Sequence, residues 1–321
     1  MRPHQLQGTA LRYFLEVAQG GSIAHASAHL HVAASALSRR IADLEAQLGT
    51  PLFERHARGM LLTEAGEILA RHARRTLLDS DRVLGEIDAL RGLKAGRVRL
   101  ATSDAFANEL VPQLCAEFQR THPGIRFHVQ VLPTAQVPAA VRSGQADIGL
   151  CFSRAAHPDI AVAWRQRAPV FALLPVGHAL ARVRRLTLRR MAAFPLALPP
   201  PETTIRQLID VACNRQNLQL DPVLVSGHAQ TMLHFVASGG GLSVGSDIAA
   251  RQGMASGQVL VRPLSDDGMD LRDIEVQTLA GRHLPVAVQA FLDRLCARLR
   301  QSAVAPARHT GRAGSTPIQP D

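Results

Sequence analysis

One stretch of the sequence carries the residue pattern of a catalytic nucleophile. Residues 241–245 match G-x-S-x-G, the pattern around the reactive serine of α/β-hydrolases. An acid, Asp266 or Asp273, and then His283 follow in the order of a hydrolase triad. That chemistry needs the serine at a sharp strand-to-helix turn, whereas Ser243 follows a helix-like segment and lies between apolar residues typical of a short strand. A serine hydrolase is therefore an unfavoured alternative, and we expect no catalytic residue here.

Three histidines lie close together near the N-terminus. His25 and His29 are four residues apart on one predicted helix, and His31 follows them. Metal sites usually add cysteine or carboxylate ligands, and none lies nearby in the sequence. We therefore predict a solvated or phosphate-facing surface here, with no metal and no cofactor.

A polar helix face just beyond these histidines is suited to nucleic acid. Apolar residues at helical spacing predict a buried face on a helix that begins near Ala34, and they are Leu37, Ile41, Leu44 and Leu48. The opposite face carries Ser35, Arg39 and Ala42. Small and hydrogen-bonding side chains fit the major groove of DNA, where bulky apolar ones find no partner.

A shorter helix is predicted before it, from Ser22 to Leu30, with Ser22 as its N-cap. A tight connection through His31 and Val32 joins the two helices. This layout is typical of a helix-turn-helix whose second helix reads bases. On spacing alone, two packed helices of any helical fold remain an equal alternative.

The motifs of this region resemble the N-terminal signature of LysR-type transcriptional regulators. The matching residues are Ser22, Ala26, Leu30-His31-Val32, Ala36-Leu37-Ser38-Arg39, Ile41, Leu44-Glu45, Leu48-Gly49, Pro51-Leu52-Phe53-Glu54-Arg55 and Leu62-Thr63-Glu64-Ala65-Gly66. The resemblance extends, more loosely, to about residue 300. It implies an N-terminal all-α winged helix-turn-helix, a long linker helix and a two-lobed α/β effector domain of the type II periplasmic-binding-protein kind. The implied function is transcription regulation, not catalysis.

The sequence departs from this family where the second helix begins. The family usually has Ser-Gln-Pro, and here the residues are Ala33, Ala34 and Ser35. Without a capping serine at Ala33, Ser35 is an alternative helix start. No glutamine is present to contact adenine, so the base preference does not transfer. Arg40 replaces a common glutamine on the flank of the helix.

Residues 51–62 are too short and too rich in glycine and arginine for a helix, and they predict a two-stranded wing with Arg55, His56 and Arg58 near its tip. Wing arginines can enter the minor groove or hold phosphates. For Arg58, an ordinary solvated turn residue is the alternative. The expected DNA-binding residues are Ser22, Ala34, Ser35, Ser38, Arg39, Arg40, Arg55 and Arg58.

Thr63 is the predicted N-cap of a long helix that runs to about Arg91. Its apolar residues form a roughly heptad-like stripe of Ile68, Leu69, Ala73, Leu77, Val83, Leu84, Ile87 and Leu90. A helix of this length with one apolar seam needs a partner, and packing on its own domain is the alternative. The resemblance favours pairing, which gives a homodimer or homotetramer on two-fold promoter DNA.

From Arg97 onward, strand-like runs alternate with helical ones and predict an α/β fold. Strands are expected at 98–102, 126–132, 148–152, 170–175, 196–198, 223–226 and 274–279. Helices are expected at 106–120, 135–143, from Ile205 and at 285–300, with a helix-like segment at 232–238. We expect domains at 1–62 (winged helix-turn-helix), 63–91 (linker helix) and 97–301 (effector binding). Within the last, lobe I takes 97–168 and 269–301 and lobe II takes 169–268. Residues 302–321 have the composition of a disordered tail.

Hydroxyl residues precede several predicted helices of the effector domain. Helix N-termini hold anions, so we expect a small anionic metabolite in a cleft between the lobes. The expected effector-binding residues are Thr102, Ser103, Thr134, Thr203, Thr204, His228 and Thr231. For Thr102, Ser103, Thr134, Thr203 and Thr204, a simple helix cap is the alternative. His228 and Thr231 are matched only by their position near the glycine turn at residues 239–241.

Four cysteines stand far apart without metal-type spacing, at Cys115, Cys151, Cys213 and Cys296. They are typical of buried thiols in a reducing compartment. Some LysR relatives sense redox state through a cysteine pair, so a redox-sensing regulator is an alternative. The sequence has no Cys-x-x-Cys motif, which is a pattern associated with an activated thiolate.

The charge of the chain gives little information about DNA. The 321 residues are 46% apolar and carry a formal charge of +10. Up to Gly92, however, 11 arginines face 10 acidic residues, so the predicted DNA-binding part is nearly neutral. Binding must depend on where a few charges lie. No signal-peptide core or membrane-length apolar run is present, which predicts a cytoplasmic protein.

Overall fold

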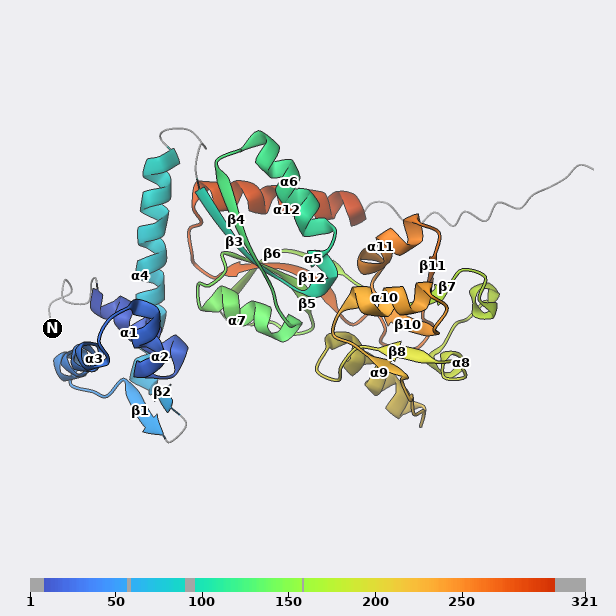
Figure 1. Cartoon of the computed structure of the whole chain (residues 1–321), viewed down its shortest axis with the longest axis horizontal. Coiled ribbons are helices and arrows are strands. Elements are labelled where there is room, and N and C mark those ends of the chain that lie inside the picture. Colours follow the sequence, from blue (N-terminus) through green and yellow to red (C-terminus); the bar gives the residue numbers. More distant parts are fainter. Residues whose placement is uncertain (1–8, 57–58, 90–95, 158, 304–321) are drawn as a thin grey trace, which may run out of the picture.

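The computed structural model describes residues 9–56, 59–89, 96–157 and 159–303. Its three parts follow one another in Figure 1: an N-terminal helical unit with a two-stranded sheet, then two α/β lobes, each built on its own five-stranded sheet. The long helix α4 (Glu64–Ala89) stands between the N-terminal unit and the first lobe. Within the described chain, no helix is both long and apolar enough to cross a membrane.

The N-terminal unit confirms the predicted winged helix-turn-helix. Helices α1 (Thr9–Gly20), α2 (Ile23–Leu30) and α3 (Ala34–Leu48) precede the wing strands β1 (Phe53–His56) and β2 (Gly59–Leu62). The Ser22 hydroxyl accepts a hydrogen bond of 3.0 Å from the backbone N–H of His25, so it caps α2 as predicted. The predicted first helix began at Leu6, and residues 1–8 lie outside the described residues.

Helix α3 begins without a side-chain cap. Ala33 occupies the N-cap position and offers no hydrogen-bond acceptor, and Ala34 is the first helical residue. The alternative start at Ser35 is therefore wrong. The helix forms without that cap because Leu37, Ile41 and Leu44 are all buried against α1, and packing of an apolar face outweighs one missing capping bond.

Helix α4 begins where the sequence predicts. The Thr63 hydroxyl accepts a hydrogen bond of 3.0 Å from the backbone N–H of Gly66 and donates one of 2.8 Å to the Pro51 carbonyl. Some residues of its predicted apolar stripe are buried and others are exposed. Of the predicted stripe, Leu69 and Ala73 are buried in the N-terminal core, whereas Ile68 is 57%, Val83 45% and Ile87 52% exposed. Ala70 and Leu78, which the predicted stripe did not include, are also buried, Ala70 in the N-terminal core and Leu78 against lobe I.

The sheet of lobe I has the strand order β4-β3-β5-β12-β6. Its strands are β3 (Gly96–Thr102), β4 (Ile125–Val131), β5 (Ile148–Ser153), β6 (Ile160–Arg167) and β12 (Asp273–Leu279). Strand β12 returns from the far side of lobe II and pairs antiparallel with both β5 and β6. Lobe I is thus built from two separate stretches of the chain.

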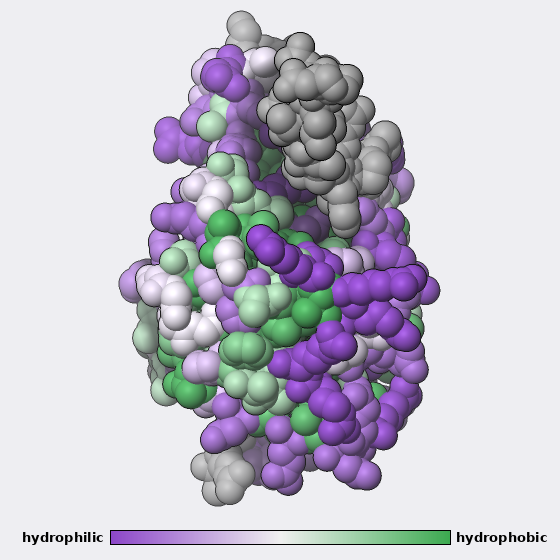
Figure 2. Space-filling view, turned by 90° about the vertical axis from the view of Figure 1, so that its right-hand side faces the viewer, coloured by the Kyte–Doolittle hydropathy of each residue, from purple (hydrophilic) through white to green (hydrophobic). Residues whose placement is uncertain are grey.

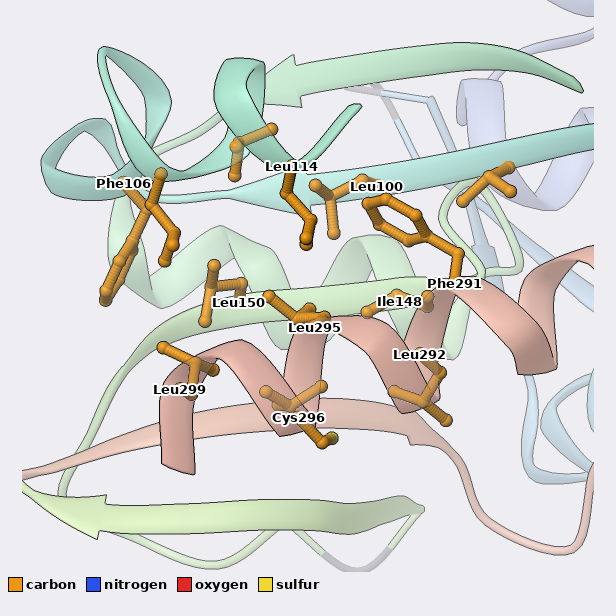
Figure 3. Packing of buried hydrophobic residues seen from close by; sticks show 14 of the residues in the cluster. Leu100, Phe106, Leu114, Ile148, Leu150, Phe291, Leu292, Leu295, Cys296 and Leu299 are labelled. Atoms are coloured by element: carbon orange, nitrogen blue, oxygen red, sulfur yellow. The ribbon is translucent and has the colours of Figure 1, made fainter. Parts of the chain in front are cut away.

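Helices cover both faces of this sheet (Figure 1). They are α5 (Asp104–Ala107), α6 (Leu110–Thr121) and α12 (Val286–Ala303) on one face, and α7 (Val137–Arg142), which follows the 3₁₀ turn Thr134–Gln136, on the other. Figure 3 shows Leu100 and Ile148 of the strands facing Phe291 of α12. The predicted helix 106–120 is in fact two helices, because the chain leaves helical geometry at Glu109.

Lobe II has the strand order β11-β7-β10-β8-β9. Its strands are β7 (Phe171–Pro175), β8 (Leu196–Leu198), β9 (Leu224–Val225), β10 (Leu242–Gly245) and β11 (Val259–Pro263). Its helices are the 3₁₀ turn Ala179–Arg182, α8 (Leu188–Met191), α9 (Thr204–Arg215), α10 (Ala229–Ala237) and α11 (Asp247–Ala255). Figure 2, which views the lobe II end of the molecule, shows a hydrophobic area flanked by hydrophilic side chains. Strands β6 and β11 and helices α8 and α11 were not predicted.

Candidate DNA-binding surface and effector site

The face of α3 that is predicted to contact DNA is exposed to solvent. Ala34, Ser35, Arg39 and Arg40 are exposed, and Ser38 is half-buried at the edge. Within the part of the chain that the structure describes, neither Arg39 nor Arg40 forms an ion pair. Their guanidinium donors are therefore available for phosphate or base oxygens.

The wing is fixed to this helix by Glu45, which sequence reasoning matched to the family pattern but did not include among the functional residues. Its carboxylate accepts hydrogen bonds from the backbone N–H groups of Leu52 (2.8 Å) and Phe53 (3.3 Å). These bonds fix the position of the start of strand β1 relative to α3. Arg55 is exposed on β1, and Arg58 lies outside the described residues.

The Ser22 hydroxyl oxygen caps α2, which leaves its hydrogen available to a phosphate. The histidine region differs from the prediction in one respect, because a carboxylate does join it. Nδ1 of His29 lies 2.8 Å from a Glu16 carboxylate oxygen on α1. Among the described residues, no group of three metal-binding side chains forms here or elsewhere.

Two hydroxyl residues end the first strand of lobe I, and they differ in their bonding. Thr102 is fully buried and donates to the Leu150 carbonyl at 3.1 Å, which gives this hydroxyl a partner inside the sheet. Ser103 is only 4% exposed, and its hydroxyl oxygen has no hydrogen-bond partner in the described chain. Buried polar groups are nearly always paired, so Ser103 is the stronger of the two as a ligand-binding residue.

The lobes meet at helix N-termini. Asp104, next to Ser103, accepts a hydrogen bond of 2.6 Å from the backbone N–H of Ala229 at the start of α10. The Arg154 guanidinium, just after β5, donates to the Gln207 side chain of α9 at 3.3 Å. The predicted segments around Ser103, Thr203 and His228 therefore border the same junction between the lobes.

The other predicted effector residues have the following positions. Thr203 caps α9 by accepting from the Arg206 N–H at 3.3 Å, and Thr204 is the first helical residue. His228 holds the N-cap position of α10 and Thr231 is exposed one turn later. Thr134 begins a 3₁₀ turn, and the described structure gives it no side-chain hydrogen bond.

Arg272, which sequence reasoning missed, lies buried where the chain crosses between the lobes. It is 1% exposed, its Nε donates to the Ala168 carbonyl on the other crossover at 2.8 Å, and its guanidinium lies 4.0 Å from the centre of the Phe152 ring. Its Nη1 has no hydrogen-bond partner within the described residues. Burial lowers the pKa of Arg272 to about 9, although Asp247 acts in the opposite direction. No local sequence pattern marks this residue, because its burial arises from the joining of distant segments.

Ser243 lacks the geometry of a nucleophile. It is fully buried in strand β10, between β7 and β8, and its hydroxyl donates to the Ala197 carbonyl at 2.8 Å. A hydrolase serine is instead exposed at the tip of a strand-to-helix turn.

The thiols are likewise poorly suited to redox chemistry. Burial raises the pKa of all four, to about 11 for Cys115, about 12 for Cys151 and about 11 for Cys213, and upward for Cys296. A reactive thiolate needs a lowered pKa.

Comparisons with known proteins agree with this architecture. The family described as "Bacterial regulatory helix-turn-helix protein, lysR family" matches residues 9–67, and the "LysR substrate binding domain" matches residues 91–300. The HTH-type transcriptional regulator YfeR of Shigella flexneri is 30% identical over 234 residues, which cover 73% of this chain and 76% of that protein.

Solved structures show the same fold. A cysteine-to-aspartate variant of full-length OxyR from Pseudomonas aeruginosa has a TM-score of 0.67 at 22% identity, covering 90% of this chain and 95% of that one. The effector binding domain of QuiR in complex with shikimate has a TM-score of 0.53 at 20% identity, covering 64% of this chain and 98% of that one.

A winged helix-turn-helix joined to a two-lobed ligand-binding domain defines a ligand-responsive transcription regulator. The chain belongs to the LysR family of DNA-binding transcriptional regulators. Members of this family bind promoter DNA and small-molecule effectors, and they oligomerise.

Proposed function

We propose that two copies of this protein place their α3 helices in successive major grooves of a two-fold promoter site. Ser35, Ser38 and Arg39 would contact the bases or phosphates of the groove, and Arg55 and Arg58 of the wing would contact the flanking backbone. Ser22, Ala34 and Arg40 would border the same interface. The observation that carries this proposal is the exposed α3 face, whose arginines form no ion pair with the described residues, opposite the buried apolar face of Leu37, Ile41 and Leu44.

Helix α4 would pair the two copies. Ile68 lies beside an apolar hollow of about 450 Å³, which Leu48, Leu52 and Leu69 help to line. An exposed isoleucine next to an apolar hollow is suited to knob-into-hole packing against a second copy. We propose a homodimer through this helix and a homotetramer through the effector domains.

The effector would be a small anion bound between the lobes. Ser103 and Arg272 each have a buried polar atom without a partner, and Arg272 supplies positive charge. Thr203, Thr204 and His228 would contribute from lobe II, with Thr102, Thr134 and Thr231 at the margins. Shikimate, which QuiR binds, is an example of such a carboxylate. Binding would change the relative orientation of the lobes and of the paired subunits, and so the spacing between the DNA-binding units or the bending of the DNA. We propose no catalytic activity.

The test is genome-wide footprinting of the full-length protein on its own chromosome, followed by binding assays on a bound promoter. Arg39→Ala is expected to weaken binding, and Arg120→Ala, an exposed change on α6, serves as the control. If Arg39 contacts phosphate, the loss will be uniform across sequences and the salt slope will fall by about one. Wild-type affinity of Arg39→Ala would remove Arg39 from the interface, and absence of any footprint would reject the proposal.

A further inference from the structure

A polar hollow lies outside the junction between the lobes. It has a volume of about 230 Å³ and lies between the first half of α4 and lobe I. Arg71, Arg74 and Arg75 reach it from α4, and Arg142 reaches it from the end of α7. The three α4 arginines stand at i, i+3 and i+4, so they share one face of the helix.

The charges around this hollow do not balance. Four arginines line it, against two carboxylates, Glu67 and Asp159. In the described part of the chain, none of these arginines forms an ion pair within 4.0 Å. The arginines around the hollow therefore outnumber the carboxylates, and neither carboxylate forms an ion pair with them among the described residues.

The surroundings of Arg74 disfavour its positive charge. Its Nε is buried and has no hydrogen-bond partner in the described residues. Burial lowers the pKa of Arg74, and the charges of Arg142 and Arg71 lower it further, whereas Glu67 and Asp159 act in the opposite direction. An anion in the hollow would supply the missing acceptor and reduce the repulsion among the arginines.

We propose that this hollow binds a small phosphate-bearing anion. Guanidinium groups present planar, forked donors that match the oxygens of a phosphate, and four arginines lining one hollow favour a multiply charged group. The small volume suits a compact molecule and excludes a DNA duplex. The site shares no residue with the proposed effector site between the lobes.

The position of the hollow gives this anion a regulatory consequence. Arg142 belongs to lobe I and the other arginines to the linker helix, so a bound phosphate bridges the two. Other contacts hold the same pair of elements together: Leu78 of α4 packs in the lobe I core, and the Gln19 side chain of α1 approaches the Ser143 carbonyl at 3.5 Å. The anion therefore fixes the DNA-binding unit and linker against lobe I.

The test uses the full-length protein and inorganic pyrophosphate. Inorganic phosphate is the smaller analogue with a single phosphoryl group, and sodium chloride at matched ionic strength is the blank. Titration calorimetry of wild type is expected to show one pyrophosphate per chain. Arg74→Gln and Arg142→Gln are expected to weaken binding by about tenfold or more each, because each removes charged donors. Arg120→Gln, the same charge change on exposed α6, is expected to bind as wild type does.

A second measurement, the melting temperature, distinguishes a loss of anion binding from a failure of the variant to fold. Without anion, Arg142→Gln is expected to have a melting temperature equal to or above that of wild type, since repulsion is relieved. With pyrophosphate, wild type and Arg120→Gln are expected to gain melting temperature while Arg142→Gln gains little. Equal binding by all variants, or no binding of either phosphate at millimolar concentration, would overturn the proposal. Promoter binding is measured separately, so its loss would bear on the proposed function and not on this site.

Discussion

The Asp104 carboxylate of lobe I accepts a 2.6 Å hydrogen bond from the backbone N–H of Ala229, the first residue of helix α10 in lobe II. Its second oxygen lies 3.4 Å from Nδ1 of His228. Helix N-termini attract anions, and here the protein's own carboxylate takes that position. Together with the Arg154–Gln207 hydrogen bond and the two chain crossovers, this contact joins the two lobes.

Asp104→Ala is expected to lower the free energy of unfolding by about 1–2 kcal/mol, since a charge-assisted bond at a helix N-terminus is lost. Urea unfolding of the full-length protein measures this change. Asp221→Ala, which removes an exposed carboxylate elsewhere in lobe II, is the control and is expected to have little effect. Equal stability of the two variants would show that the contact does not hold the lobes together.

The pH dependence of stability is expected to reflect Asp147, which is buried beside Arg99 and Arg282. Burial acts to raise the pKa of Asp147, but the hydrogen bonds and charge of Arg99 and the charge of Arg282 outweigh it, so the pKa is lowered. A lowered folded-state pKa gives stability that is present above the unfolded value of about 3.9 and is lost as pH falls through the folded value.

Asp147→Asn is therefore expected to melt below wild type at neutral pH, and the difference should shrink in acid. Thermal unfolding of both proteins from neutral pH down to about pH 3 measures this. A difference that stays constant across that range would contradict the assignment.

Gly66→Ala is expected to disrupt the junction of the wing and α4. A β-carbon at this position would collide with the Leu52 backbone carbonyl, which cannot move without breaking the bonds that fix the wing. We expect a loss of about 2–4 kcal/mol in stability and impaired promoter binding, measured by thermal unfolding and a mobility-shift assay. Gly227→Ala is the control, because its β-carbon would meet only one side-chain atom at 3.9 Å.

Peroxide is expected to leave DNA binding unchanged, because burial raises the pKa of every cysteine thiol and so suppresses the reactive thiolate. Thiol titration of the treated and then denatured protein should still count four free cysteines. Disappearance of two thiols, together with altered promoter binding, would favour the redox-sensing alternative.

Val83→Asp is expected to weaken self-association through α4. Val83 is 45% exposed on the helix, so the change costs the single chain little but places a charge in the proposed dimer contact. Sedimentation velocity of wild type and variant measures the oligomer. Val211→Asp on α9 of lobe II is a matched control with the same 45% exposure, and it is expected to associate as wild type does.

The sequence by itself determined the N-terminal unit and the start of the linker helix. The Ser22 and Thr63 caps, the buried Leu37 face and the short wing depend on residues a few positions apart, and local hydrogen bonds and helical periodicity fix such features. The prediction of two lobes in the effector domain came from the family resemblance. Sequence reasoning left open whether the linker stripe pairs with a second copy or packs on its own domain, and it could not say which residues take each role, because that depends on how the domains pack.

Tertiary structure alone decided which distant residues meet. Strand β12 lies between β5 and β6, more than a hundred positions earlier in the chain, and this pairing brings Arg272 to the Ala168 crossover. In the same way Asp104 reaches Ala229, and Arg142 joins the arginines of α4. Such contacts arise when separate apolar faces are buried together, and no local spacing records them.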